Sequence, residues 1–124
     1  MKIFKKTIQL FLILMPGLYA QAQKAHKIWE GNLVPRDFEV FYKENYTIVS
    51  GDISIINSDL KDLASLSNLM GIEGSLRIEK NKNIKSLDGL ENIVGVDSDI
   101  EITENKSLTD ISALNNLESC RNLV

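Results

Sequence analysis

Three consecutive segments of this chain repeat one pattern of apolar residues. They cover 51–72, 74–96 and 98–120, and they open with GDISII, GSLRIE and SDIEIT. The first step between them is 23 residues and the second is 24. Self-similarity at such a period is typical of a solenoid, whose coils must stack because none can bury its apolar side alone. Seven columns are apolar in all three segments: Ile53/Leu76/Ile100, Ile55/Ile78/Ile102, Leu60/Ile84/Leu108, Leu63/Leu87/Ile111, Leu66/Leu90/Leu114, Leu69/Ile93/Leu117 and Ile72/Val96/Cys120.

Each segment begins with two apolar residues at period two, such as Leu76 and Ile78. This spacing predicts a short strand with alternate side chains pointing inward. Strands of successive coils would pair in parallel, about 4.8 Å apart, through right-handed connections. The later apolar residues recur every third position, which favours tight corners or brief 3₁₀ turns over α-helix. We therefore expect a right-handed repeat solenoid, mainly β, with a parallel sheet of short strands.

Polar columns accompany the apolar ones. Asn68, Asn92 and Asn116 share one column, and Asn81 and Asn105 share another, in which the first segment has Ser58. A stacked Asn side chain can bond the backbone of its own turn or of the next coil, so we interpret both columns as scaffold. Arg77 and Glu101 should be neighbours on adjacent strands, as should Lys80 and Glu104.

The segment GSLRIEKNKNIKSLDGLENIVGV resembles a coil of the receptor L-domain family, a relative of the leucine-rich repeats. Leu76-x-Ile78-x-x-Asn81 matches the core of a leucine-rich repeat, and SLDGLENI at 86–93 resembles the second half of an L-domain coil. The resemblance covers about 49–124 and implies an L-domain-like solenoid of about three coils. The best-known members are the ligand-binding halves of animal growth-factor and insulin receptors, and similar domains occur in secreted bacterial proteins. This chain has fewer coils than the receptors and lacks their disulfides.

Residues 23–48 differ in composition from the repeated segments, because they hold every aromatic residue that follows residue 22. Pro35 can start a helix, and Phe38, Phe41 and Tyr42 would form one face of it before Asn45 ends it. We interpret this as a capping helix over the open apolar end of the first coil. The alternative is an aromatic patch for a sugar or protein partner. Gly31–Val34 predicts an additional strand, and Gln23–Lys27 a disordered tail.

Residues 1–22 read as a signal peptide. Lys2, Lys5 and Lys6 precede an apolar run that is too short to span a bilayer, and Ala20-Gln21-Ala22 supplies a cleavage pattern. The sequence thus predicts an exported protein, in the periplasm, on the outer surface or secreted, with no membrane span once the signal is removed. The remaining chain has 11 basic and 17 acidic residues, hence a net charge of −6. Such a chain is a poor candidate for binding nucleic acid, which needs clustered Lys and Arg.

A search for catalytic groups finds little. The one His, His26, lies in the predicted tail, and the one Cys, Cys120, lies in an apolar column. Core packing is the expected role of Cys120, with a reactive or intermolecular thiol as the alternative. No zinc spacing, Ser–His pair or phosphate loop is present. We therefore expect no enzyme activity, no cofactor and no metal.

Carboxylates offer one alternative. Asp52 and Asp99 should share an outward column with Ser75, with Asp97 near Asp99. Paired acids could hold Ca²⁺ or act on sugars, as in a carbohydrate-active β-helix enzyme. Solvated surface is the preferred interpretation, because three coils provide little concavity.

These inferences predict a non-enzymatic interaction module, secreted or on the cell surface, that binds a protein or glycan partner. The alternatives are a structural spacer and a fragment of a larger surface protein. Solenoids bind through their continuous sheet face. That face lacks aromatic residues, which disfavours stacking of sugars. The candidate binding face consists of Ser54, Ile56, Arg77, Glu79, Glu101 and Thr103.

A fourth coil should begin near Cys120, with Val124 in the column of Leu76 and Ile100. An alignment shifted by one residue would instead compare RNLV with the other strand openings. We expect the solenoid to be truncated at the C-terminus. An uncapped coil would leave an open strand edge, so end-to-end self-association is a further expectation.

Overall fold

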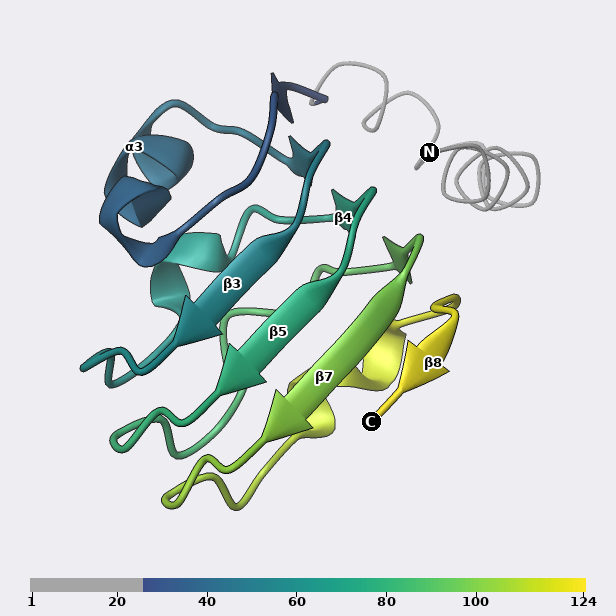
Figure 1. The fold of residues 1–124 in the computed structure, drawn as a ribbon. Coiled ribbons are helices and arrows are strands. Elements are labelled where there is room, and N and C mark those ends of the chain that lie inside the picture. The colour runs from purple at the N-terminus through teal and green to yellow at the C-terminus, as the bar shows by residue number, and fades with distance from the viewer. Residues whose placement is uncertain (1–25) are drawn as a thin grey trace.

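The computed structural model describes residues 26–124, which form two parallel sheets of short strands and one short α-helix (Figure 1). The predicted signal peptide lies outside the described residues. Sheet A has the order β1 (Ile28–Trp29), β2 (Ile48–Val49), β4 (Gly71–Ile72) and β6 (Gly95–Val96). Sheet B has the order β3 (Ile53–Ile56), β5 (Leu76–Glu79), β7 (Asp99–Thr103) and β8 (Asn122–Leu123). The parallel short strands are confirmed, but the sequence predicted one sheet and the structure has two.

The strand register follows the sequence alignment. In sheet B, Ile53 pairs with Leu76 and Leu76 with Ile100, while Ile55 pairs with Ile78 and Ile78 with Ile102. In sheet A, Val49 pairs with Ile72 and Ile72 with Val96. The chain therefore passes through sheet A and then sheet B before it begins the next passage. We call each passage a layer: 28–47, 48–70, 71–94 and 95–118, followed by 119–124.

Turns connect the sheets where the sequence predicted corners. Asn57, Lys80 and Glu104 follow β3, β5 and β7 directly, and each has a positive φ of 53° to 55°. Short 3₁₀ helices come next in two of the layers, η2 (Ala64–Leu66) and η3 (Ser112–Asn116). In the layer between them Gly89 has a φ of 112°, and a Cβ at this position would overlap the carbonyl of Leu63. The expected 3₁₀ corners are thus confirmed in the second and fourth layers.

The N-terminal segment contains the predicted helix. The 3₁₀ turn η1 (Pro35–Asp37) leads into α3 (Phe38–Lys43), and Asn45 follows with a φ of 60°. Phe38 and Phe41 are buried, as expected, but Tyr42 is 47% exposed. Successive helical residues are about 100° apart, so Tyr42 turns away from the face that carries Phe41. The helix packs against η2 of the next layer, and Figure 1 shows it at the N-terminal end of the fold.

This segment is also a layer in register with the others. Trp29 pairs with Val49, and Leu33 forms a parallel bridge with Ile53. The predicted strand at Gly31–Val34 is therefore a single bridge. The expected tail is wrong for its described part, because the Lys27 carbonyl accepts a hydrogen bond from the Thr47 backbone N–H at 2.9 Å. The sequence indicated only a cap, but the backbone of this segment also pairs with the second layer.

The core runs through all the layers between the two sheets and the 3₁₀ side. Nineteen buried apolar residues form one cluster, and the columns predicted from the alignment supply most of them. Burial decreases in the last layers: Leu87 is fully buried, whereas Ile111, in the same column, is 50% exposed. Leu123 and Val124 are 54% and 67% exposed. The last layer thus presents apolar side chains beside the edge strand β8.

The C-terminal register differs from the prediction. Leu123, and not Val124, pairs with Ile100, and Asn122 pairs with Asp99. The shift of one residue lets the Val124 backbone N–H donate to the Ile100 carbonyl at 2.8 Å, while the Val124 carbonyl accepts from Ile102 at 2.9 Å. The alternative alignment of RNLV is therefore the one that the structure adopts.

Asparagine ladders join the layers as the sequence indicated. The Asn81 side chain is fully buried, and its Oδ1 accepts from the Ser58 backbone N–H at 2.9 Å. Its Nδ2 donates to the Ile55 carbonyl at 2.8 Å and to Asn105 Oδ1 at 3.0 Å. Asn105 Nδ2 in turn donates to the Ile78 carbonyl at 2.7 Å. These bonds satisfy backbone groups that the turns would otherwise bury unpaired.

Leu87→Ala should destabilise the protein by about 2–5 kcal/mol, since it truncates a fully buried Leu. Ile111→Ala is the matched control, because it removes a half-exposed side chain from the same column. We expect the control to cost less than about 1 kcal/mol. Urea unfolding of both variants measures the difference, and equal losses would mean that the column is packed alike in both layers.

Asn81→Ala should destabilise the protein by more than about 2 kcal/mol, because it leaves the Ser58 N–H and the Ile55 carbonyl without their partner. Asn83→Ala is the control: this exposed side chain makes one long contact of 3.5 Å with the Asp59 carbonyl. The control should change stability by less than about 0.5 kcal/mol. Thermal unfolding decides, and similar midpoints for the two variants would contradict the ladder's role.

Candidate functional site

The six residues of the predicted binding face lie together on sheet B. Parallel pairing aligns Ser54 with Arg77 and Arg77 with Glu101 in one row. It aligns Ile56 with Glu79 and Glu79 with Thr103 in a second row. Between them lie the inward-pointing residues of the core, such as the fully buried Ile78. All six side chains are at least partly exposed, so the sequence placed them correctly on one face.

Charge on this sheet face is mixed and partly paired. Arg77 Nε lies 3.6 Å from Glu101 Oε2, which confirms the predicted cross-strand pair. The predicted pair of Lys80 and Glu104, which occupy the positive-φ turns after their strands, forms no ion pair among the residues that the structure describes. Ile56 is 40% exposed and gives the face one apolar contact point. The face is therefore a small surface on which one apolar, one cationic and two anionic groups have fixed positions.

The predicted column of acids is a hydrogen-bonded ladder at the start of sheet B. Asn32 Oδ1 accepts from the Asp52 backbone N–H at 2.8 Å, and Asp52 Oδ1 accepts from the Ser75 backbone N–H at 2.7 Å. The Asp99 backbone N–H donates to Ser75 Oγ at 3.2 Å. Each side chain thus bonds to the neighbouring layer, and the carboxylates are spread along the stack instead of converging on one point.

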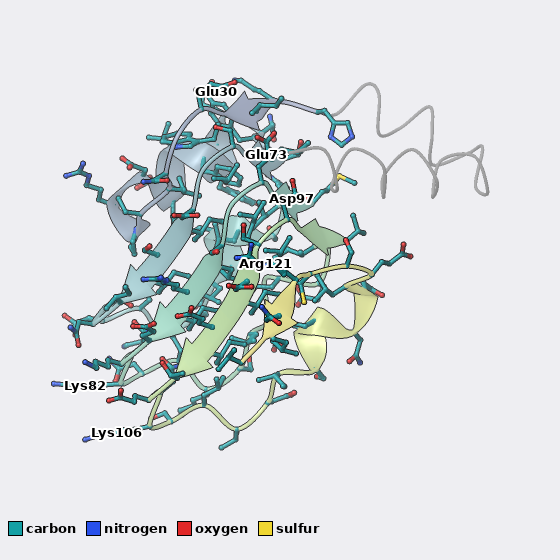
Figure 2. All side chains as sticks on the ribbon, turned by 45° about the vertical axis from the view of Figure 1, so that its right-hand side comes forward. Glu30, Glu73, Lys82, Asp97, Lys106 and Arg121 are labelled. Atoms are coloured by element: carbon teal, nitrogen blue, oxygen red, sulfur yellow. The ribbon has the colours of Figure 1, made fainter. Side chains whose placement is uncertain are left out.

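Asp99 has a cationic partner. Arg121 Nε and Nη2 donate to its two carboxylate oxygens at 3.0 and 3.1 Å, and Asn122 Nδ2 donates at 2.9 Å. These bonds from Arg121 and Asn122 lower the pKa of Asp99. Figure 2 shows Glu73, Asp97 and Arg121 following one another along this side of the molecule, whereas Lys82 and Lys106 extend from the loops after β5 and β7. Within residues 26–124, no group of three or more His, Cys, Asp or Glu side chains could hold a metal ion.

A groove of about 980 Å³ runs beside sheet A and crosses the layers. One row of its lining consists of Thr47, Met70, Val94 and Glu118, each from a successive layer. A second row contains the amide side chains Asn45, Asn68, Asn92 and Asn116. His26 and Lys27 lie at the end formed by the first layer. The molecule therefore has two repetitive surfaces, the sheet B face and this groove.

His26 lies in a different environment from the predicted one, whereas Cys120 does not. His26 lies 3.4 Å from Thr47 Oγ1 through Nδ1, and burial lowers the pKa of its imidazole. Cys120 is half-buried and packs against the core, which fits its expected packing role. No described helix is long and apolar enough to cross a membrane.

The sequence analysis did not identify the groove. It assigned Asn68, Asn92 and Asn116 to the scaffold, and each does donate to a carbonyl of the preceding layer. The residues two positions after them, Met70, Val94 and Glu118, form the other row of the groove, but Met70 and Val94 are apolar and so gave no sequence signal of an outward column.

Comparisons with protein-family models, with curated proteins and with solved structures found no significant match to this chain. The inferences on function therefore depend on the geometry described above.

Arg121→Gln should raise the pKa of the Asp99 carboxyl towards its ordinary value of 3.8, because the guanidinium bonds that lower it are removed. Since the folded-state pKa is depressed, the stabilisation from this contact is present above the unfolded-state pKa and is lost as pH falls through the folded-state pKa. An NMR titration of the carboxyl carbon measures the shift. Lys106→Gln, on the loop after β7 and away from Arg121 in Figure 2, is the control and should leave that pKa unchanged.

Proposed function

We propose that this chain is a non-enzymatic interaction module whose sheet B face recognises a protein partner outside the cell. The observation that carries the proposal is the register that fixes Arg77 between Ser54 and Glu101 and Glu79 between Ile56 and Thr103. A face of fixed charges at parallel-strand spacing can discriminate between partners at little cost in side-chain ordering.

The proposal extends to the class of fold. Strands paired at steps of 23 and 24 residues, asparagine ladders and 3₁₀ corners support a right-handed solenoid resembling the receptor L-domain family. The apolar run of residues 1–22 supports export to the periplasm, the outer surface or the medium.

The chemistry of the face favours a protein over a sugar as the partner. It has no aromatic residue on which a pyranose could stack. It does combine one exposed Ile with Arg and Glu side chains, a mixture that protein interfaces use. Arg77 is the candidate anchor, because Arg is enriched among the residues that contribute most to binding.

A structural role is the second candidate, and the last layer supports it. Leu123 in the edge strand β8, Val124 directly after it and Ile111 of the last layer are exposed. An edge strand with apolar neighbours can accept another strand. The chain would then act as a structural spacer, joined through β8 to a copy of itself.

A charge-swap pair tests the first role. Arg77→Glu should weaken capture of the partner from extracellular proteins by about tenfold or more, because it reverses the central charge of the face. Arg77→Glu combined with Glu101→Arg restores the cross-strand pair but not the pattern presented to the partner, so binding should remain weak while stability recovers. Quantitative pull-down followed by titration with the captured protein measures both effects.

Val40→Asp, on the exposed side of α3, is the control for this experiment. It should leave capture unchanged. Loss of capture with Val40→Asp but not with the swapped pair would place the interface on the helix and contradict the proposal. A protein that captures no partner and associates with itself through β8 would favour the structural role.

A further inference from the structure

The groove beside sheet A repeats with the period of the layers. The backbone N–H groups of Met70, Val94 and Glu118 donate to the carbonyls of Thr47, Met70 and Val94 at 2.7, 2.9 and 2.9 Å. Each member of this row therefore lies one layer beyond the last. Adjacent parallel strands are about 4.8 Å apart, so four members extend over about 14 Å. The groove presents a similar set of groups once in each layer.

Three Asn side chains in the amide row of the groove use their nitrogen in hydrogen bonds and leave their oxygen without a donor from the described protein. Asn68, Asn92 and Asn116 donate through Nδ2 to the carbonyls of Tyr42, Ser67 and Glu91 at 3.3, 2.6 and 2.7 Å. These bonds hold each side chain in place. Within residues 26–124, no donor is bonded to their Oδ1 atoms, so the groove carries a row of three fixed acceptors, one in each of the second, third and fourth layers.

The spacing of these acceptors can be compared with the spacing of hydrogen-bond donors in candidate ligands. An extended peptide presents N–H groups on one side at every second residue, which is about 6.6 Å, so it falls out of step with the row after one contact. A nucleic acid would be repelled by Glu91 and Glu118, which also line the groove. A linear glycan with 1,4-linked β-pyranoses advances by close to one layer for each sugar. Successive sugars face opposite ways, but each carries hydroxyl donors on both edges, so every unit can donate to the row. We propose that the groove binds a linear, neutral, β-1,4-linked glycan that lies along the stacking direction.

The other lining groups fit this ligand. Glu118 adds a carboxylate acceptor for hydroxyl groups, while the Glu91 carboxylate already accepts from the Gly89 backbone N–H at 2.7 Å; both charges would repel an acidic polysaccharide. Met70, Val94 and Leu117 provide apolar contact for the C–H faces of the rings. No aromatic residue lines the groove, so each sugar should add only a small increment and affinity should depend on chain length. This site is separate from the sheet B face, and the two proposals can fail independently.

The experiment titrates the ¹⁵N-labelled full chain with glucose and with β-1,4-linked glucose oligosaccharides of increasing length, followed by NMR. We expect shifts in the side-chain amides of Asn68, Asn92 and Asn116 and in the backbone amides of Met70 and Val94. Affinity should rise with each added sugar until about four units fill the groove, one per layer, and then level off. An extended Gly-Ser peptide of similar length should produce no such series.

Val94→Arg places a long side chain in the middle of the groove, at a partly exposed position. The longest oligosaccharide should then bind no more tightly than the disaccharide, because the chain can no longer pass through all layers. Arg77→Glu with Glu101→Arg should keep the wild-type length dependence, which separates this site from the sheet B face. If Val94→Arg unfolds the chain, Glu118→Arg at the exposed end of the row replaces it and should shorten the binding length by one unit.

Three results would overturn the proposal. One is the absence of amide shifts with every oligosaccharide. Another is equal affinity for the monosaccharide and the longest oligosaccharide. The third is tighter binding of the peptide than of the glycan, which would assign the groove to a protein segment.

Discussion

Parallel backbone pairing between residues 20 to 24 positions apart is the constraint on which the rest of this structure depends. It fixes Leu33 beside Ile53, Ile53 beside Leu76 and Leu76 beside Ile100. Once those pairs are set, every residue between them must be accommodated in a closed passage of nearly constant length. The apolar columns then meet inside the stack, and the polar columns meet outside it. The core, the ladders and both candidate surfaces are consequences of one register.

The ladders show how the register is maintained where strands end. Parallel strands leave backbone groups unpaired at each turn, and a buried unpaired group costs about 1–3 kcal/mol. Asn81 resolves this by bonding to the layer before it and to the layer after it. Asn32, Asp52 and Ser75 repeat the same solution at the start of sheet B. Apolar burial thus drives the stacking, and polar side chains fix its register. For this reason the column of Asp52, Ser75 and Asp99 bonds to the backbone of neighbouring layers.

Much of this arrangement could be predicted because the position of a residue in the repeat determines its position in the stack. The strands, the corners, the Asn columns and the Arg77–Glu101 pair all follow from aligning three segments. Sheet A was missed because its strands are only two residues long, with Gly71 and Gly95 in β4 and β6, so no alternating pattern exists to detect. The first layer was missed because its turn is an α-helix and its step is 20 residues, which removes it from the alignment. The groove was missed because it belongs to no single layer and arises only when four layers are stacked.

Interlayer register is also the most direct quantity to measure. A NOESY spectrum of the labelled protein should show contacts between the backbone protons of Ser54 and Arg77, of Arg77 and Glu101, and of Asp99 and Asn122. It should likewise show Val49 beside both Trp29 and Ile72. Observation of these contacts together would establish the stacked layers on which both surfaces depend. Contacts displaced by one residue in sheet B would turn Arg77 and Glu101 inward and contradict the account.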